Sequence, residues 1–281
     1  MKFIYGLICT LTMTFSLPAY AQTQWQVLQP GLEYAAIALK TEQASGKLHA
    51  FRFQLTDYQL HLAFAQDLKR KATTVRQLAT HQRALVAING GFFSPDHTML
   101  GLRIQDGHQL SPLQATSWWG VFYIKKGKPR IVSQRQYHAN DQINLAIQSG
   151  PRLLINGRIP KLKPGLAERS VICIDHKQRI LLAITQNVPI TTEDLAEQLR
   201  QPTHKGGLGC YQALNLDGGH SSQLFAHVDQ FRLSITGFSA VTDALIVLPT
   251  ANAVSETSPA PPVVTIPDRQ RRAHLQTYNY F

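Results

Sequence analysis

The chain lacks the residue patterns of most metal and redox proteins. It has three cysteines and no Cys-x-x-Cys spacing, which excludes the common zinc and thiol-redox motifs. No His-Glu-x-x-His or paired-histidine spacing occurs among its 11 histidines, so the sequence predicts neither a metal site nor a cofactor. Beyond the N-terminal segment, no apolar run is long enough to span a bilayer. We therefore expect no transmembrane segment once that N-terminal segment is removed.

Acidic residues are scarce relative to basic ones, which gives a formal net charge of +11. A basic chain attracts anions, such as phosphorylated glycans. The longest basic run is only Lys69-Arg70-Lys71, and there is no recognition-helix or base-stacking motif. We therefore expect an anionic glycan or sugar partner and no nucleic acid.

The first 21 residues have the pattern of a secretory signal. Lys2 supplies the positive start, an apolar run covers residues 3–17, and Ala19 and Ala21 occupy the two positions that a signal peptidase recognises. The alternative is a buried N-terminal helix. The signal peptide predicts a mature chain beginning at Gln22 and a secreted protein, which we expect in the periplasm.

Two cysteines remain after removal of the signal, because Cys9 lies inside its apolar run. In an oxidising compartment, Cys173 and Cys210 can form one disulfide. They can equally remain as buried thiols, since cysteine packs as a small hydrophobic residue. The sequence leaves both alternatives open.

Short apolar or alternating segments separated by turns predict many strands and few helices. The clearest helix covers residues 191–200, where Thr191 or Thr192 is available as an N-cap. We expect an α+β fold with a large, mixed or mostly antiparallel sheet, formed by a single domain over residues 22–250. Residues 251–281 are predicted to be a disordered, proline-rich, basic tail.

Two segments share a design in which a buried strand is followed by a polar residue and two glycines. The first contains Asn89-Gly90-Gly91-Phe92, and the second contains Asn215-Leu216-Asp217-Gly218-Gly219. Glycine allows a ligand to approach the backbone closely. The alternative is an ordinary hairpin turn, for which Asn-Gly and Asp-Gly are leading signals.

Between these segments lie Gly150-Pro151, ahead of a strand, and Arg169, just before another strand. The four segments, in this order, resemble the phosphodiester glycosidase family, to which the lysosomal uncovering enzyme is related. The resemblance covers roughly residues 30–248. The departures are His220, where small residues are common in the family, Cys173, and the pair Trp118-Trp119. They bear on the detailed substrate more than on the fold.

The resemblance implies hydrolysis of a sugar whose anomeric carbon carries a phosphodiester. It implies Asp217 as nucleophile or base, Arg169 as the charge that stabilises the phosphate, and Asn89 as a residue that orients the substrate. His220 is a candidate acid or base, and its alternative is a hydrogen-bonded turn histidine. Glu168 and Asp243 are the candidates for a second carboxylate. The expected substrate-binding residues are Gly90, Gly91, Phe92, Gly150, Pro151, Asn215, Gly218, Gly219, Ser221 and Trp119.

Two other functions compete with this prediction. A non-catalytic periplasmic module that binds anionic glycans explains the charge, the signal and the Trp118-Trp119 pair equally well. A serine esterase is disfavoured, because Gly219-His220-Ser221-Ser222-Gln223 lacks the final glycine of a nucleophile elbow.

Overall fold

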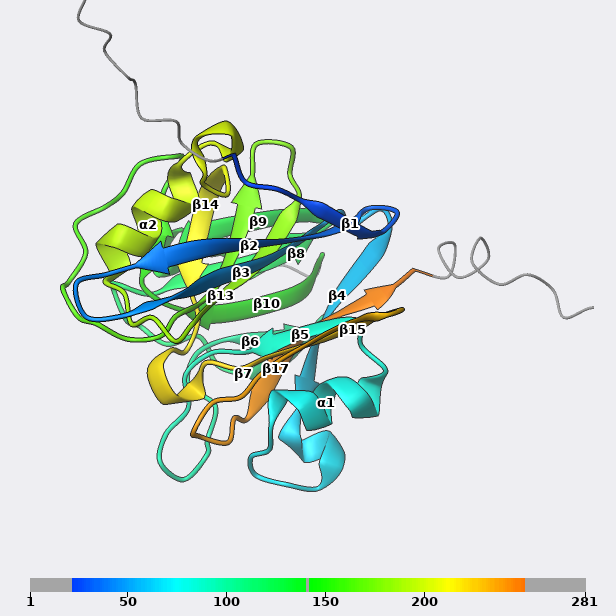
Figure 1. Ribbon diagram of the computed structural model, residues 1–281. Helices are drawn as coiled ribbons and strands as arrows, with labels where there is room; N and C mark the ends of the chain where they lie inside the picture. The colour runs from blue at the N-terminus through cyan, green and yellow to red at the C-terminus, as the bar shows by residue number, and fades with distance from the viewer. Residues whose placement is uncertain (1–21, 140–141, 251–281) are drawn as a thin grey trace, which may run out of the picture.

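The computed structural model describes residues 22–139 and 142–250. The predicted signal peptide (1–21) and tail (251–281) lie outside the described residues. The described chain forms three antiparallel sheets and two α-helices (Figure 1). The predicted α+β class is confirmed, with the strands divided among three sheets.

The largest sheet has seven strands in the order β1-β2-β3-β13-β12-β14-β11. Its central strands are almost fully buried, as their continuous apolar sequences require. The strands are β1 (Gln26–Gln29), β2 (Leu32–Lys40), β3 (Ser45–Phe53), β11 (Arg152–Leu154), β12 (Ser170–Asp175), β13 (Ile180–Gln186) and β14 (Cys210–Asn215).

The two smaller sheets have five strands each, in the orders β7-β6-β10-β8-β9 and β16-β15-β5-β17-β4. The first contains β6 (Arg103–Gln105), β7 (His108–Ser111), β8 (Gly120–Lys125), β9 (Lys128–Ser133) and β10 (Ile143–Ser149). The second contains β4 (Tyr58–Phe64), β5 (Val86–Asn89), β15 (Leu224–Val228), β16 (Phe231–Ile235) and β17 (Asp243–Pro249).

Each α-helix covers the outside of one sheet (Figure 1). Helix α1 (Val75–Gln82) packs on β5, β15 and β17, and Thr74 caps it by accepting a hydrogen bond from the Gln77 N–H. Helix α2 (Thr192–Arg200) packs on β11 and β14, with Thr191 as its N-cap. The single turns of 3-10 helix are η1 (Ala65–Leu68), η2 (Gln134–Gln136), η3 (Thr203–Lys205) and η4 (Gly219–Ser221).

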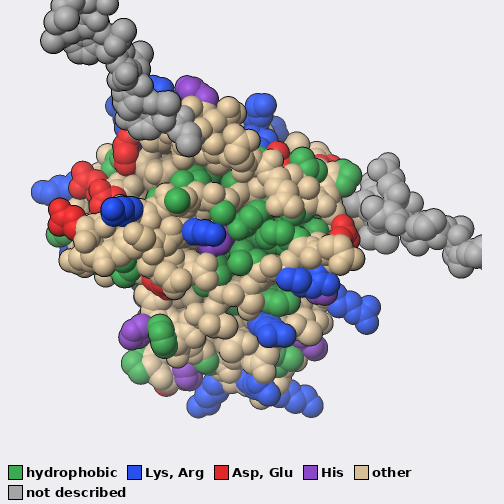
Figure 2. Space-filling model, in the orientation of Figure 1, with side chains coloured by type: hydrophobic (Ala, Val, Ile, Leu, Met, Phe, Trp, Pro, Cys, Tyr) green, Lys and Arg blue, Asp and Glu red, His purple; other side chains and the backbone are tan. Residues whose placement is uncertain are grey.

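One core joins all three sheets. It includes Leu60 and Leu62 of β4, Ile147 of β10 and Leu214 of β14. Figure 2 shows hydrophobic side chains in the band between β2 and the sheet below it. The rings of Tyr34 on β2 and Phe231 on β16 lie 4.7 Å apart. Burial of this shared apolar surface holds the sheets, and therefore the ends of their strands, in fixed positions.

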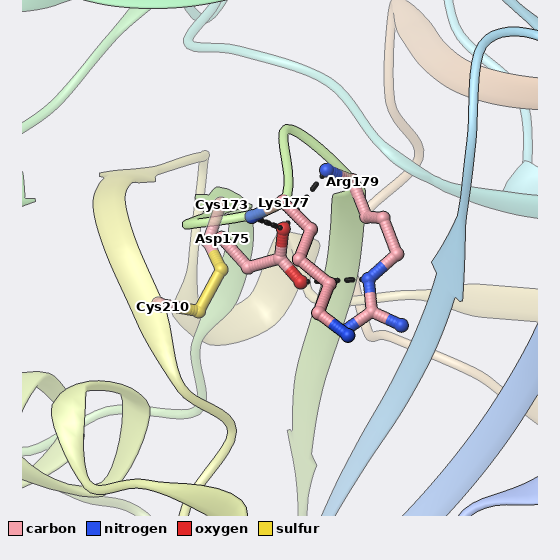
Figure 3. Close-up of a disulfide and its surroundings, with 5 residues drawn as sticks. All are labelled: Cys173, Asp175, Lys177, Arg179 and Cys210. Carbon is pink, nitrogen blue, oxygen red and sulfur yellow. Dashed lines mark hydrogen bonds and ion pairs between the residues drawn. A yellow bond between two sulfur atoms is a disulfide. The ribbon is translucent and has the colours of Figure 1, made fainter.

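A disulfide joins Cys173 of β12 to Cys210 of β14, with their Cα atoms 6.0 Å apart (Figure 3). The structure thus selects the first of the two alternatives for these cysteines. Nearby, Asp175 accepts hydrogen bonds from the Lys177 and Arg179 N–H groups and forms an ion pair with the Arg179 side chain. These contacts close the β12–β13 turn, at the far end of β12 from Arg169.

Within the described residues, no helix has the length and apolar character needed to cross a membrane.

Candidate active site

Four strand ends meet at one place. Strands β5, β10 and β14 end at Asn89, Ser149 and Asn215, and β12 begins at Ser170. Main-chain hydrogen bonds connect the segments beyond these ends: Asp217 N–H donates to Gly90 O at 3.1 Å. The four segments singled out in the sequence therefore form a single site.

Asn89 lies at the centre of this junction and is fully buried. Its Nδ2 donates to the Asp217 carbonyl at 2.7 Å, and its Oδ1 accepts from Ser170 Oγ at 2.6 Å and from Gln223 N at 3.1 Å. Its amide is thus occupied by protein partners. Asn89 fixes the main chain at Asp217, and its part in orienting the substrate stays a prediction.

Asp217 follows β14 and is largely but not completely buried. Its Oδ1 accepts from the Gly218 N–H at 3.0 Å, and Ser221 also hydrogen-bonds to the carboxylate. Burial raises the pKa of Asp217, and these hydrogen bonds oppose the rise. Asp243 raises the pKa further and Arg103 lowers it, because both charges lie nearby. A carboxyl group with a raised pKa in a junction of this kind is typical of an acid–base or nucleophilic residue.

Gly90 and Gly91 are required for close packing. Neither has a positive φ angle, so they do not form the hairpin turn that the sequence left as an alternative. A Cβ atom on Gly90 would lie 2.6 Å from Asp243 Cγ, and one on Gly91 would lie 2.9 Å from Arg103 Cζ. The two glycines therefore admit a buried pair of charged side chains directly beside the turn.

Arg169 extends alongside the Asp217-Gly218 segment. A Cβ atom on Gly218 would lie 3.9 Å from Arg169 Cδ, and Gly219 N–H donates to the Glu168 carbonyl at 2.7 Å. The guanidinium donates to the carbonyls of Ile190 at 3.2 Å and Gly165 at 2.5 Å. Burial lowers the pKa of Arg169. In the described part of the chain it forms no ion pair, so its charge is available to an anion.

Gly150 and Pro151 lie against Asn215. The Asn215 Nδ2 donates to Gly150 O at 3.1 Å, and its main-chain N–H donates to Pro151 O at 3.0 Å. Within the described residues, the Asn215 Oδ1 atom is buried and has no hydrogen-bond partner. A buried acceptor of this kind is uncommon, which makes Asn215 a candidate for contact with substrate.

Three aromatic rings form one wall of the site. The Phe92 ring lies 5.0 Å from Trp119 and 6.1 Å from Trp118, between ring centroids. Trp119 is 8% exposed and packs against Gly150, whereas Trp118 is 52% exposed. Trp119, one of the expected substrate-binding residues, is therefore mostly buried, and Trp118 presents the larger face to solvent.

His220 is exposed, and its ring packs edge-on against Phe238 at 5.6 Å. No hydrogen bond joins its ring to another predicted site residue in the described chain. Glu168 accepts a hydrogen bond from Asn187 N–H at 2.8 Å, and Asp243 is fully buried in an ion pair with Arg103. Of the two candidates for a second carboxylate, Asp243 therefore has no surface on which to meet a substrate.

The sequence patterns did not indicate three residues that hold the site together. Arg103 and Gln148 are completely buried charged or polar side chains, and Ser170 binds the side chain of Asn89. The available signal was the occurrence of a charged residue, Arg103, between the apolar residues Leu102 and Ile104. Among residues 22–139 and 142–250, no cluster of three or more His, Cys, Asp and Glu side chains could hold a metal ion.

Comparisons with known proteins agree with this arrangement. The profile of a family described as phosphodiester glycosidase matches residues 82–248, which include the strand-Gly-Gly segments, Gly150-Pro151 and Arg169. A stretch of 95 residues is 34% identical to the uncharacterized protein YigE of Escherichia coli (strain K12). That stretch is 31% of this chain and only 37% of YigE.

Two solved structures are similar in fold. The catalytic domain of zebrafish N-acetylglucosamine-1-phosphodiester alpha-N-acetylglucosaminidase, auto-inhibited by its pro-peptide, matches with a TM-score of 0.58 and 17% identity. The match covers 81% of this chain and 88% of that domain. A hypothetical protein from Synechocystis also gives a TM-score of 0.58, at 14% identity, over 82% of this chain and 64% of that protein.

Proposed function

This chain belongs to the phosphodiester glycosidase family, and from that premise we propose that it hydrolyses the bond between a sugar's anomeric carbon and a phosphodiester. The observation that carries the proposal is the packing of the Arg169 side chain beside Gly218, the residue whose N–H binds the Asp217 carboxylate. A partly buried carboxyl group with a raised pKa and a partly buried guanidinium that forms no ion pair with the described residues are the two groups that this substrate needs.

The reaction breaks the bond between the anomeric carbon and the phosphate oxygen. The electron pair leaves with the phosphate, and water supplies a hydroxyl group to the sugar. The phosphate monoester that departs has a second pKa of about 6, so it needs less protonation than an alcohol leaving group. Charge stabilisation matters more, and Arg169 can supply it with N–H groups that its main-chain contacts hold in place.

Asp217 acts at the anomeric carbon, as nucleophile or as the base that activates water. Its backbone is fixed on both sides, by Asn89 at its carbonyl and by Gly90 at its N–H. Fixed backbone contacts keep the reacting oxygen in place, and this lowers the entropic part of the barrier. The active form is the carboxylate, so activity should fall at acidic pH as Asp217 is protonated.

The sugar ring is proposed to lie against the aromatic wall, between Trp118 and the Gly150-Pro151 turn. Asn215 Oδ1 and the Trp119 indole N–H are buried there, and neither has a hydrogen-bond partner in the described chain. Hydroxyl groups of a sugar are suitable partners for both. Phe92, from the segment after the first glycine pair, completes this surface.

We also propose that the protein is exported, most simply to the periplasm, as one domain over residues 22–250. The Cys173–Cys210 disulfide supports this location, since disulfides persist mainly in oxidising compartments. An anionic phosphorylated glycan or another sugar-1-phosphodiester of the cell envelope is then within reach.

The test is hydrolysis of a panel of sugar-1-phosphodiesters that vary in sugar and anomeric configuration. Each phosphodiester is paired with the matching alkyl glycoside, which has no phosphate. Release of free sugar from a phosphodiester and not from its alkyl partner is the expected result. Saturable binding of phosphodiesters without any sugar release would instead support the non-catalytic glycan-binding module.

A further inference from the structure

Arg103 and Asp243 form a fully buried ion pair beneath the Asn89-Gly90-Gly91 turn. Both residues have no exposed surface, and Arg103 Nε lies 2.5 Å from Asp243 Oδ2. The second carboxylate oxygen of Asp243 accepts a hydrogen bond from Thr242 Oγ1 at 3.1 Å. Neither charge can reach a substrate directly.

The guanidinium of Arg103 is also bound to the backbone around the site. Its Nη2 donates to the Phe92 carbonyl at 3.4 Å, and its Nη1 lies 3.2 Å from the Gln148 carbonyl. Further carbonyls within 3.3 Å of Nη1 belong to Leu100, Gly101 and Leu102. One side chain thus fixes the segment after the first glycine pair and the strand that leads to Gly150.

The glycine pair itself is shaped by these charges. A Cβ atom at Gly90 would overlap the Asp243 carboxylate, and one at Gly91 would overlap the Arg103 guanidinium. The Gly90 carbonyl accepts the hydrogen bond from Asp217 N–H. The Gly90 N–H donates to the main-chain carbonyl of Asp243 at 2.9 Å. The ion pair, the turn and Asp217 are therefore connected by direct contacts.

We propose that Arg103 and Asp243 are a buried positioning pair that holds the Gly90-Gly91 turn against Asp217 and sets the electrostatic field at its carboxylate. The proposal rests on the assignment of Asp217 as the reacting carboxylate. A buried ion pair adds little stability compared with well-packed apolar residues, whereas two opposite charges at fixed positions define a field. The negative charge of Asp243 raises the pKa of Asp217, and the positive charge of Arg103 lowers it. Removal of one charge therefore leaves the effect of the other uncompensated.

The test compares Asp243→Asn, Arg103→Lys and Glu33→Gln in the full chain. Glu33→Gln is the control, because it breaks the partly buried ion pair with Arg52 on β2 and β3. The carboxyl carbon of Asp217 is followed by NMR across pH, with its signal assigned from Asp217→Asn. All three variants leave unchanged the other charged or titratable side chains on the segments beside Asp217, which are Glu168, Arg169 and His220.

We expect Asp243→Asn to lower the pKa of Asp217, because it removes a negative charge and leaves Arg103 in place. The acid limb of the activity profile should then move to lower pH. Arg103→Lys keeps the positive charge and loses the planar set of donors, so turnover should fall on the order of 10²-fold with little change in KM. Glu33→Gln should alter neither the titration nor turnover.

Gly90→Ala is the substitute variant if Asp243→Asn does not fold. It keeps both charges, and its added Cβ atom displaces the Asp243 carboxylate. It should lower turnover, as Arg103→Lys does. A folded Asp243→Asn protein with the parent's Asp217 titration, or folded Arg103→Lys and Gly90→Ala proteins with the parent's turnover, would overturn the proposal. If the parent hydrolyses none of the phosphodiesters, the proposed function fails, and the NMR titration still decides the role of the pair.

Discussion

The Asn89 side-chain amide donates a 2.7 Å hydrogen bond to the main-chain carbonyl of Asp217. This bond ties the end of β5 to the end of β14, two strands in different sheets. A buried asparagine therefore links the two Gly-Gly segments, and the carboxylate takes its position from both.

Replacement of Asn89 by alanine should destabilise the protein. It would leave the Ser170 hydroxyl and the Gln223 N–H buried without the acceptor that they now share. We expect a loss of about 1–3 kcal/mol in the free energy of unfolding, measured in urea. The control is Asn144→Ala, an exposed site on β10, which should stay within about 0.5 kcal/mol of the parent. Equal stability of the two variants would contradict the role of Asn89.

Asp217→Asn should be more stable than the parent at neutral pH. Burial raises the pKa of Asp217 above its ordinary value, so the folded state binds the proton more tightly than the unfolded state. The parent therefore loses stability as pH rises from the ordinary pKa to the raised one, by about 1.4 kcal/mol for each pH unit between those two values. The asparagine variant lacks this loss, and the two curves should converge at low pH.

Thermal unfolding across pH measures this difference. The exposed Glu42→Gln variant is the control and should follow the parent at all pH values. An Asp217→Asn protein that is less stable than the parent at neutral pH would contradict this prediction. It would show that the ionised carboxylate stabilises the folded state.

The two tryptophans should differ in their main contribution, with Trp118 affecting chiefly substrate binding and Trp119 chiefly stability. Trp118→Ala removes a half-exposed ring from the aromatic wall and should raise KM about 3- to 10-fold, in line with the energy of one aromatic contact. Trp119→Ala removes a buried ring beside Gly150 and should lower stability by about 3–5 kcal/mol. Val27→Ala, on exposed β1, is the control for Trp118. An unchanged KM in Trp118→Ala would remove this residue from the sugar site.

Loss of the disulfide should affect stability and leave the site intact. Cys173 and Cys210 are separated by 37 residues, and a loop of that size predicts about 2–4 kcal/mol of stabilisation. The double alanine variant should therefore unfold at lower urea, with KM close to that of the parent. Identical unfolding midpoints for the oxidised and the reduced parent protein would contradict a stabilising role for the disulfide.

Strong local patterns in the sequence were sufficient to predict much of the fold. Strands β12 (Ser170–Asp175) and β8 (Gly120–Lys125) coincide with short apolar runs in the sequence. Helix α2 lies where its Thr191 cap and its charged ends place it. In each case the residues that define the element are adjacent in the chain, so local periodicity reports them directly.

The sequence patterns did not predict elements and residues whose placement depends on tertiary contacts. Strand β10 was not predicted, since Gln148 and Ser149 interrupt its apolar run. The buried Gln148 side chain is accommodated by hydrogen bonds to the main chain of Leu102 and Gln114, which are remote in sequence. Edge strands such as β16 and β9 alternate with exposed polar residues and lack a clear signal. Arg103 was missed for the same reason, because its partner Asp243 is 140 residues away.

The sequence predicted the segments that form the candidate site, whereas it assigned roles to residues without knowledge of their burial. The sequence assigned Asn89, Asp217, Gly150 and Arg169 to one site, and in the structure their segments are in contact. It did not distinguish a residue that meets substrate from one that positions it, because that distinction depends on burial. Asn89 is the clearest case: its side chain is fully occupied inside the protein.

The most direct test of the account is the turnover of a sugar-1-phosphodiester by the parent and by Asp217→Asn, with binding of the same compound measured alongside. We predict that the variant binds the substrate about as well as the parent and loses turnover on the order of 10²–10⁴-fold. Turnover equal to that of the parent in a folded Asp217→Asn protein would contradict the account, since no reaction at this site could then depend on its carboxylate.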